Sequence, residues 1–115
     1  MTCAACHQGD GGGLEGVAPP LVGVDWVTGP AGLSARILLH GLSGPVEVLG
    51  KTYNLEMPAF GFMVDEQIAA VLTYVRRAWG HRADPVSPEF ISKLRQEYSS
   101  RDRPWSATEL LELEK

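Results

Sequence analysis

The chain has 115 residues, which suits one small domain with a limited core. Its formal net charge is −4 and it contains no basic tract, so nucleic acid is not expected as a partner. Hydrophobic residues make up 44% of the sequence, which argues against a disordered chain, and no apolar run is long enough to span a bilayer. The 13 Gly and 8 Pro predict short helices joined by long loops.

The first motif is Cys3-Ala4-Ala5-Cys6-His7, and C-x-x-C-H is the attachment signature of a c-type haem. The two thiols each form a thioether to one macrocycle in such a site, and the His is an axial ligand of the iron. A short disulfide or a thioredoxin-like redox pair is the alternative, although no βαβ pattern surrounds the motif. A zinc site needs about four ligands, and His40 and His81 lie far from any paired spacing.

A Gly-rich stretch covers residues 8–24. It lacks the Lys-Ser/Thr of a phosphate-binding loop, so its glycines predict a close approach of the backbone to a haem edge. Trp26 follows, ahead of a turn at residues 28–30. Its indole N–H either donates to a haem propionate or belongs to an ordinary core or rim Trp, and both readings stay open.

Residues 30–42 predict a helix with Pro near its first turn and Gly-Pro beyond its end. His40 lies on this helix and is interpreted as structural, with ligation of the iron as the less favoured reading. Residues 46–53 alternate in polarity and predict a short hairpin about Gly50. Tyr53, at its end, is a candidate for a hydrogen bond to a propionate or near a Met sulfur.

Met57 is followed by Pro58 in a stretch with neither helical nor strand period. A thioether on a stiff loop suits the second axial position, and a His/Met pair raises the potential of a haem iron. Met63 is the other candidate, but no Pro follows it and a core-filling role is favoured.

Residues 65–80 predict an amphipathic helix with Asp65 as its N-cap and Gly80 at its end. Its apolar stripe runs from Ile68 to Trp79. Arg76 and Arg77 are expected to complement the helix C-terminus.

Three pieces of sequence now stand in order: residues 3–7, Ala18-Pro19-Pro20-Leu21, and Met57-Pro58-Ala59-Phe60 ahead of a helix that ends in residues 74–80. In these pieces the chain resembles the class I cytochromes c over about residues 3 to 80. The resemblance implies an all-α fold of short helices and loops wrapped around one covalent haem c per chain. It also implies that helix 65–80 closes this fold.

The resemblance assigns roles to particular residues. Cys3 and Cys6 would attach the haem, and His7 and Met57 would ligate its iron. The Pro19 carbonyl would accept a hydrogen bond from the ligand imidazole, and Leu21 would pack on the porphyrin.

The ends of the chain depart from the minimal family pattern. The family's N-terminal helix is missing ahead of the motif, so we expect residues 1–80 to be a cytochrome c domain without that helix and the chain to be part of a longer polypeptide. Residues 81–115 are expected to be a helical extension packed on this domain. Its predicted parts are a helix from Ser87-Pro88-Glu89 to about Tyr98, Trp105 as an anchor to the domain that needs burial, a capping box from Ser106 to Glu109, and a solvated acidic face of Glu109, Glu112 and Glu114.

A haem with both axial positions filled has no open position for a substrate, so it transfers electrons and does not catalyse. We therefore expect a periplasmic or otherwise extracytoplasmic electron carrier, or a fused domain, attached to the membrane through a partner or a missing segment. A dehydrogenase would be its donor and a cytochrome or oxidase its acceptor. The alternative is a haem enzyme or gas-sensing domain in which the sixth ligand, Met57, is displaceable.

The surface expected to dock on redox partners is apolar and consists of Ala4, Ala5, Val17, Ala18 and residues 57–60. The alternative docking surface is a negatively charged ring of Asp10, Glu15 and Glu56.

Overall fold

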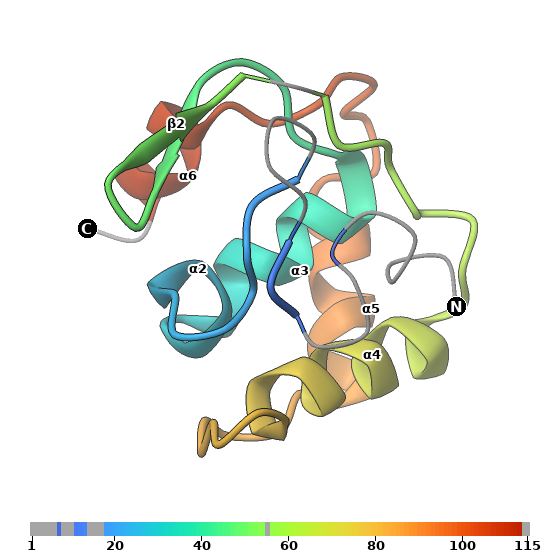
Figure 1. The fold of residues 1–115 in the computed structure, drawn as a ribbon. Coiled ribbons are helices and arrows are strands. Elements are labelled where there is room, and N and C mark those ends of the chain that lie inside the picture. The colour runs from blue at the N-terminus through green and yellow to red at the C-terminus, as the bar shows by residue number, and fades with distance from the viewer. Residues whose placement is uncertain (1–6, 8–10, 14–17, 55, 114–115) are drawn as a thin grey trace.

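In the computed structural model, the described residues form helices and a short hairpin (Figure 1). A cavity lies between these elements. The structure describes residues 7, 11–13, 18–54 and 56–113. Its elements, in chain order, are α2 (Asp25–Thr28), α3 (Ala31–His40), β1 (Val46–Val48), β2 (Lys51–Tyr53), α4 (Asp65–Arg77), α5 (Pro88–Glu97) and α6 (Ala107–Leu113). The described part of the chain is thus mostly helical. Its Cα radius of gyration is 13.1 Å, near the roughly 13 Å of a compact chain of this size.

Helix α3 lies at the centre of the molecule and matches the helix predicted over residues 30–42. Pro30 is its N-cap, where a fixed φ and a missing N–H are tolerated. Gly41 ends it with a φ of 86°, and a Cβ at this position would lie 2.6 Å from the carbonyl oxygen of Met57. Only Gly allows this close approach of the two segments.

Helix α4 begins and ends at other residues than the sequence predicts. The predicted cap at Asp65 is wrong: Val64 is the N-cap, and Asp65 is helical and forms a 2.9 Å ion pair with Arg95 of α5. The helix ends at Arg77, before the predicted end at residue 80, because Ala78 is extended with a ψ of 167°, and Trp79 follows with a φ of 54°. A side chain in the left-handed region cannot continue an α-helix.

The hairpin predicted over residues 46–53 is confirmed. Strands β1 and β2 pair antiparallel, with Val46 opposite Tyr53. The two turn residues, Leu49 and Gly50, have φ values of 52° and 79°, and the type I′ turn that suits a twisted hairpin needs positive φ at both. Val46 and Val48 are buried on one face of the hairpin.

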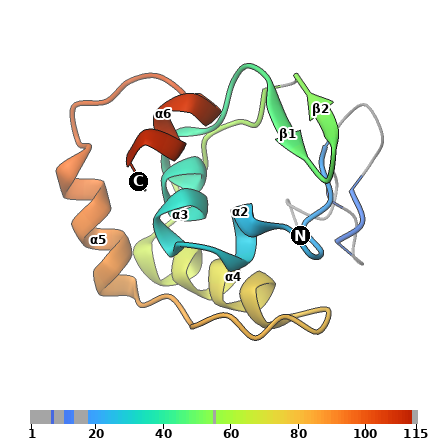
Figure 2. The same ribbon diagram turned by 90° about the vertical axis from the view of Figure 1, so that its left-hand side faces the viewer.

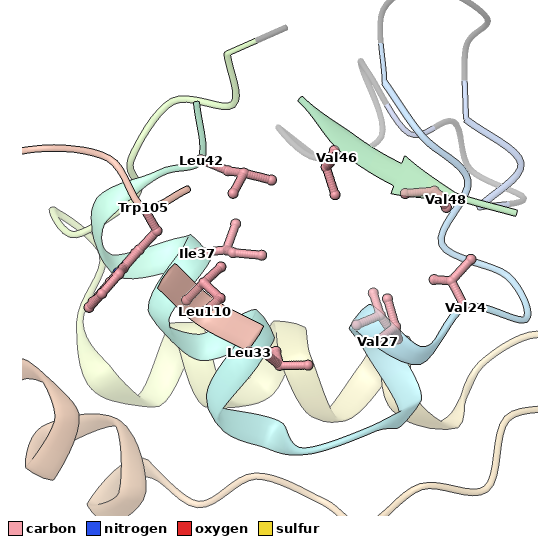
Figure 3. Close-up of a cluster of buried hydrophobic side chains, with 10 residues drawn as sticks. Val24, Val27, Leu33, Ile37, Leu42, Val46, Val48, Trp105 and Leu110 are labelled. Carbon is pink, nitrogen blue, oxygen red and sulfur yellow. The ribbon is translucent and has the colours of Figure 1, made fainter. Parts of the chain in front are cut away.

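Two hydrophobic clusters form the core, one on each side of α3. Most members of the hairpin-side cluster line the cavity, and Figure 3 shows Ile37, Leu42, Val46, Val48, Val24 and Val27 around the space between α3 and the hairpin, with Trp105 and Leu110 away from it. The cluster consists of Val24, Val27, Leu33, Ile37, Leu42, Val46, Val48, Val75, Trp105 and Leu110. The α5-side cluster joins α3, α4 and α5, which lie together in Figure 2; it consists of Ala35, Leu38, Leu39, Phe60, Ile68, Ala69, Leu72, Val86, Ile91 and Leu94.

The two C-terminal helices begin where the sequence predicts. The Ser87 Oγ accepts a hydrogen bond from the Phe90 N–H at 3.1 Å at the start of α5. In the capping box of α6, the Ser106 N–H donates to Glu109 at 3.0 Å and the Glu109 N–H donates to Ser106 Oγ at 3.2 Å.

The structure adds detail to the expectations for the C-terminal segment. Trp105, the expected anchor to the domain, is buried, with only 3% of it exposed, and it belongs to the hairpin-side cluster. Glu109 is partly exposed, and it is also paired: Arg101 lies 3.0 Å from its carboxylate, and this hydrogen bond holds the pKa of the carboxyl below the usual range. Glu112 is exposed, and Glu114 lies outside the described residues. In the described part of the chain, no helix combines the length and the apolar character that crossing a membrane requires.

Candidate functional site

An apolar cavity lies between α3, α4 and the hairpin. Its volume is about 110 Å³, and it is partly open to solvent. Its wall is apolar except for an imidazole, an indole and one hydroxyl, and consists of His7, Pro19, Pro20, Leu21, Val24, Trp26, Val27, Ser34, Ile37, Leu38, Leu42, Val46, Val48, Met57, Val71, Leu72 and Val75.

His7 is buried in this wall, with 8% of the residue exposed. Its Nδ1 lies 2.8 Å from the carbonyl oxygen of Pro19, the contact that the resemblance implies. Because a carbonyl only accepts hydrogen bonds, Nδ1 carries the proton. The lone pair of Nε2 is therefore available to a metal, and the bond to Pro19 fixes the plane of the ring.

The loop that carries Pro19 is held closely against the segment that follows His7. The Gly13 N–H donates to the His7 carbonyl at 2.9 Å. Gly13 has a φ of 79°, and a Cβ there would lie 2.6 Å from the Pro20 nitrogen. The orientation of the His7 ring thus depends on a tight backbone contact that a side chain at residue 13 would disturb.

Met57, from the middle of the sequence, lines the same cavity. Its backbone forms an antiparallel bridge with Leu42, in which Met57 N–H donates at 2.8 Å and Leu42 N–H donates at 3.0 Å. The fold therefore brings His7 and Met57 to one apolar cavity. A buried imidazole and a thioether on such a cavity are the donors that a haem iron uses in electron carriers.

The other predicted cofactor residues divide into two groups. Pro19, Leu21 and Trp26 line the cavity, whereas Tyr53 is not among the lining residues and packs half-buried against the hairpin-side cluster. The Trp26 indole N–H donates to the Glu47 carbonyl at 3.4 Å, so it has a partner in the protein. Cys3 and Cys6 lie outside the described residues.

The rival ligands lie away from the cavity. His40 is not among the lining residues; it packs edge-on against Trp105 at 6.3 Å between ring centroids. Burial, and next the charge of Arg101, lower the pKa of His40. Met63 packs against the α5-side cluster.

Several residues of the site were not predicted. Ser34 donates a hydrogen bond to the Trp26 carbonyl and lines the cavity, and Val46 and Val48 form its wall at the hairpin. The alternation of the hairpin valines could have indicated their burial. No sequence signal marks Ser34, because a polar residue within a helix is ordinarily exposed.

Arg76 does more than complement a helix terminus. It is 6% exposed, and its guanidinium donates to the carbonyls of Val27 at 2.9 Å, Gly29 at 2.7 Å and Asp84 at 2.7 Å. It thereby fixes α2, which carries Trp26 and Val27 on the cavity wall, against α4.

Comparison with known proteins gives consistent results. The family model for cytochrome c matches residues 1–79. Cytochrome c-552 of Thermus thermophilus is 40% identical over 102 residues, which cover 81% of this chain and 78% of the relative. The gluconate 2-dehydrogenase cytochrome c subunit of Pantoea cypripedii is 35% identical, with 84% of this chain and 22% of the relative covered. The cytochrome c subunit of the quinone alcohol dehydrogenase of Gluconobacter oxydans is 33% identical, with 81% and 20% covered. The chain thus spans about a fifth of the length of these two subunits.

Proposed function

Because this chain belongs to the cytochrome c family of electron carriers, which hold a covalent haem c, we propose that His7 and Met57 are the two axial ligands of its iron. The observation that carries this proposal is the cavity that both side chains line, with His7 Nδ1 bonded to the Pro19 carbonyl. Cys3 and Cys6, which directly precede His7, are the proposed thioether attachments.

The haem, when bound, supplies one reversible electron at its iron. The protein residues set how readily that electron is taken up. The Pro19 carbonyl makes the His7 imidazole a more basic ligand, and a thioether ligand such as Met57 favours the reduced state. The apolar wall excludes water, which also favours the less charged, reduced iron. With His7 and Met57 both bound to it, the iron would have no free position for a substrate.

The partners that we propose are a dehydrogenase as donor and a cytochrome or oxidase as acceptor, outside the cytoplasm. Relatives of this chain include cytochrome c subunits of dehydrogenases, and members of the family are usually extracytoplasmic. The chain would act as a periplasmic carrier or as a fused domain of a larger protein.

We further propose that residues 1–80 are the electron-carrier domain and that residues 81–115 stabilise it as an extension. In support, Ile91 and Leu94 of α5 and Leu110 of α6 are buried in the two core clusters. An extension that fills the core in this way is expected to unfold together with the carrier.

The proposal is tested in two steps. Acid acetone should leave the colour on the chain, since thioethers survive denaturation; colour in the solvent would disprove covalent attachment. Met57→Ala should then open the iron to exogenous ligands and lower the reduction potential, whereas Met63→Ala should leave both unchanged. The reverse pattern would assign the ligand to Met63. Rapid binding of carbon monoxide by the unmodified protein at neutral pH would favour a haem enzyme or gas sensor.

A further inference from the structure

The backbone around Leu42 lies between two other segments of the chain and forms hydrogen bonds to one of them on each side. The N–H and carbonyl of Leu42 itself bond to Met57. The neighbouring groups point the other way: the Gly41 carbonyl accepts from the Trp105 N–H at 3.0 Å, and the Ser43 N–H donates to the Trp105 carbonyl at 2.9 Å. This alternation is that of a β-strand, in which successive residues bond to opposite sides. Met57 and Trp105 are therefore the outer members of a three-segment backbone ladder.

On the Met57 side of the ladder, the two backbone segments pack closely together. A Cβ on Gly41 would lie 2.6 Å from the Met57 carbonyl oxygen and 3.1 Å from the Ala59 nitrogen. The Met57 segment thus rests directly on the backbone at residues 41 and 42. A displacement of that backbone would carry Met57 with it.

The ladder is also fixed on the Trp105 side. The indole is buried, the Arg101 guanidinium lies 3.5 Å above its centroid, and the Tyr98 ring meets it edge-on at 5.0 Å. Arg101 also donates to the Pro104 carbonyl at 2.7 Å and pairs with Glu109. A cation held on an aromatic face and edge-on rings are stabilising arrangements, so Trp105 is held in place from several directions.

We propose that Trp105 is a positioning residue for Met57, acting through the backbone of Leu42 to keep the thioether on the iron. The inference rests on the proposed ligation by Met57. The methionine side chain has three rotatable bonds, so the position of its sulfur depends on how firmly its backbone is held. Trp105 lies beyond residue 79, where the family match ends. The C-terminal segment thereby takes part in setting the redox properties of the carrier.

The test measures how often Met57 leaves the iron. An exogenous ligand such as imidazole binds the ferric, haem-loaded protein only when the sixth position is free, so its apparent affinity rises in proportion to the population of that state. Trp105→Ala should bind imidazole about tenfold more tightly than the unmodified protein and should have a lower reduction potential. Trp105→Phe, which keeps an aromatic ring beneath Arg101, should restore most of both properties.

Ile91→Ala is the matched control. Ile91 is also fully buried and also belongs to the C-terminal segment, but it lies in the α5-side cluster on helix α5. It should lower the melting temperature without tightening imidazole binding. If Trp105→Ala binds imidazole no more tightly than Ile91→Ala, Trp105 is only a core residue and the inference is wrong.

Two further variants separate the possible failures. Met57→Ala tests the ligation itself: if it leaves imidazole binding unchanged, the proposed function fails at Met57, whatever Trp105 does. If Trp105→Ala does not fold, Arg101→Gln replaces it, because this change removes the cation above the indole and the bond to Pro104 from a partly exposed position. Imidazole binding by Arg101→Gln as weak as that of the unmodified protein would then overturn the inference.

Discussion

Nδ1 of His7 lies 2.8 Å from the carbonyl oxygen of Pro19, and Gly13 is the residue that lets the two segments meet. A side chain at residue 13 would need both a left-handed backbone and space that the Ala18 carbonyl and the Pro20 nitrogen already occupy, at 2.7 and 2.6 Å. This contact makes the orientation of the proposed iron ligand open to a simple test.

Gly13→Ala is expected to destabilise the protein by more than the roughly 1–2 kcal/mol of a left-handed residue, because overlap with the Pro20 segment adds to it. The measurement is denaturant unfolding, together with the haem absorption spectrum. Gly23→Ala is the control, since Gly23 has a similar φ of 72° and nothing within 4 Å of its Cβ position. If the two variants lose the same free energy of unfolding, only backbone strain matters at residue 13.

Arg76→Gln is expected to lower the free energy of unfolding by about 3 kcal/mol, because the buried carbonyl of Val27 and the partly buried carbonyl of Gly29 would lose their charged donor. The neighbouring Arg77 is exposed, so Arg77→Gln should change stability by no more than about 0.5 kcal/mol. Urea unfolding of both variants measures the difference. A similar small effect for both would contradict the role given to Arg76.

His40 should make stability depend on pH. Because burial and Arg101 lower its pKa in the folded protein, the unfolded chain takes up this proton at a higher pH than the folded chain. The stability that this pKa difference contributes to the folded protein is fully present above the ordinary histidine pKa of 6.5. It is lost as the pH falls from 6.5 to the lowered pKa of the folded protein, and it does not change further below that pKa. His40→Gln should therefore lose less stability than the unmodified protein when the pH falls from about 7.5 to about 5. If urea unfolding shows the same loss of stability in His40→Gln and in the unmodified protein, His40 has the same pKa in the folded and unfolded states and the prediction is wrong.

Electron transfer to the physiological partner should depend only weakly on salt. Pro58 and Ala59, beside the proposed ligand, are exposed, and Phe62 is 81% exposed. Ala18 and Phe60, which the sequence analysis placed on this patch, are buried and cannot form its surface. Ala4, Ala5, Val17, Asp10 and Glu15 lie outside the described residues, and Glu56 is exposed.

Stopped-flow reduction at increasing ionic strength measures this salt dependence. A fall in rate of more than about tenfold between low and physiological salt would favour steering by charge over an apolar docking patch. Glu56→Gln then shows whether this carboxylate contributes to the steering.

The sequence by itself determined the features that depend on near neighbours. The turn at Leu49 and Gly50, the cap at Ser87 and the capping box from Ser106 to Glu109 each involve groups a few residues apart, so their patterns are visible in the chain. The motif at residues 3–7 and the Met-Pro pair at residues 57–58 indicated a haem for the same reason.

Only the tertiary structure decided where the longer-range partners lie. Asp65 reads as a helix cap, yet Arg95 from another helix binds it. Trp105 reads as an anchor to the domain, but only the structure shows that its backbone pairs with the segment at Leu42 that also holds Met57. Burial and pairing of this kind depend on which distant segments meet, and no local pattern of charge or hydrophobicity records that. The sequence thus indicated the proposed ligands, whereas the packing decided what holds them in place.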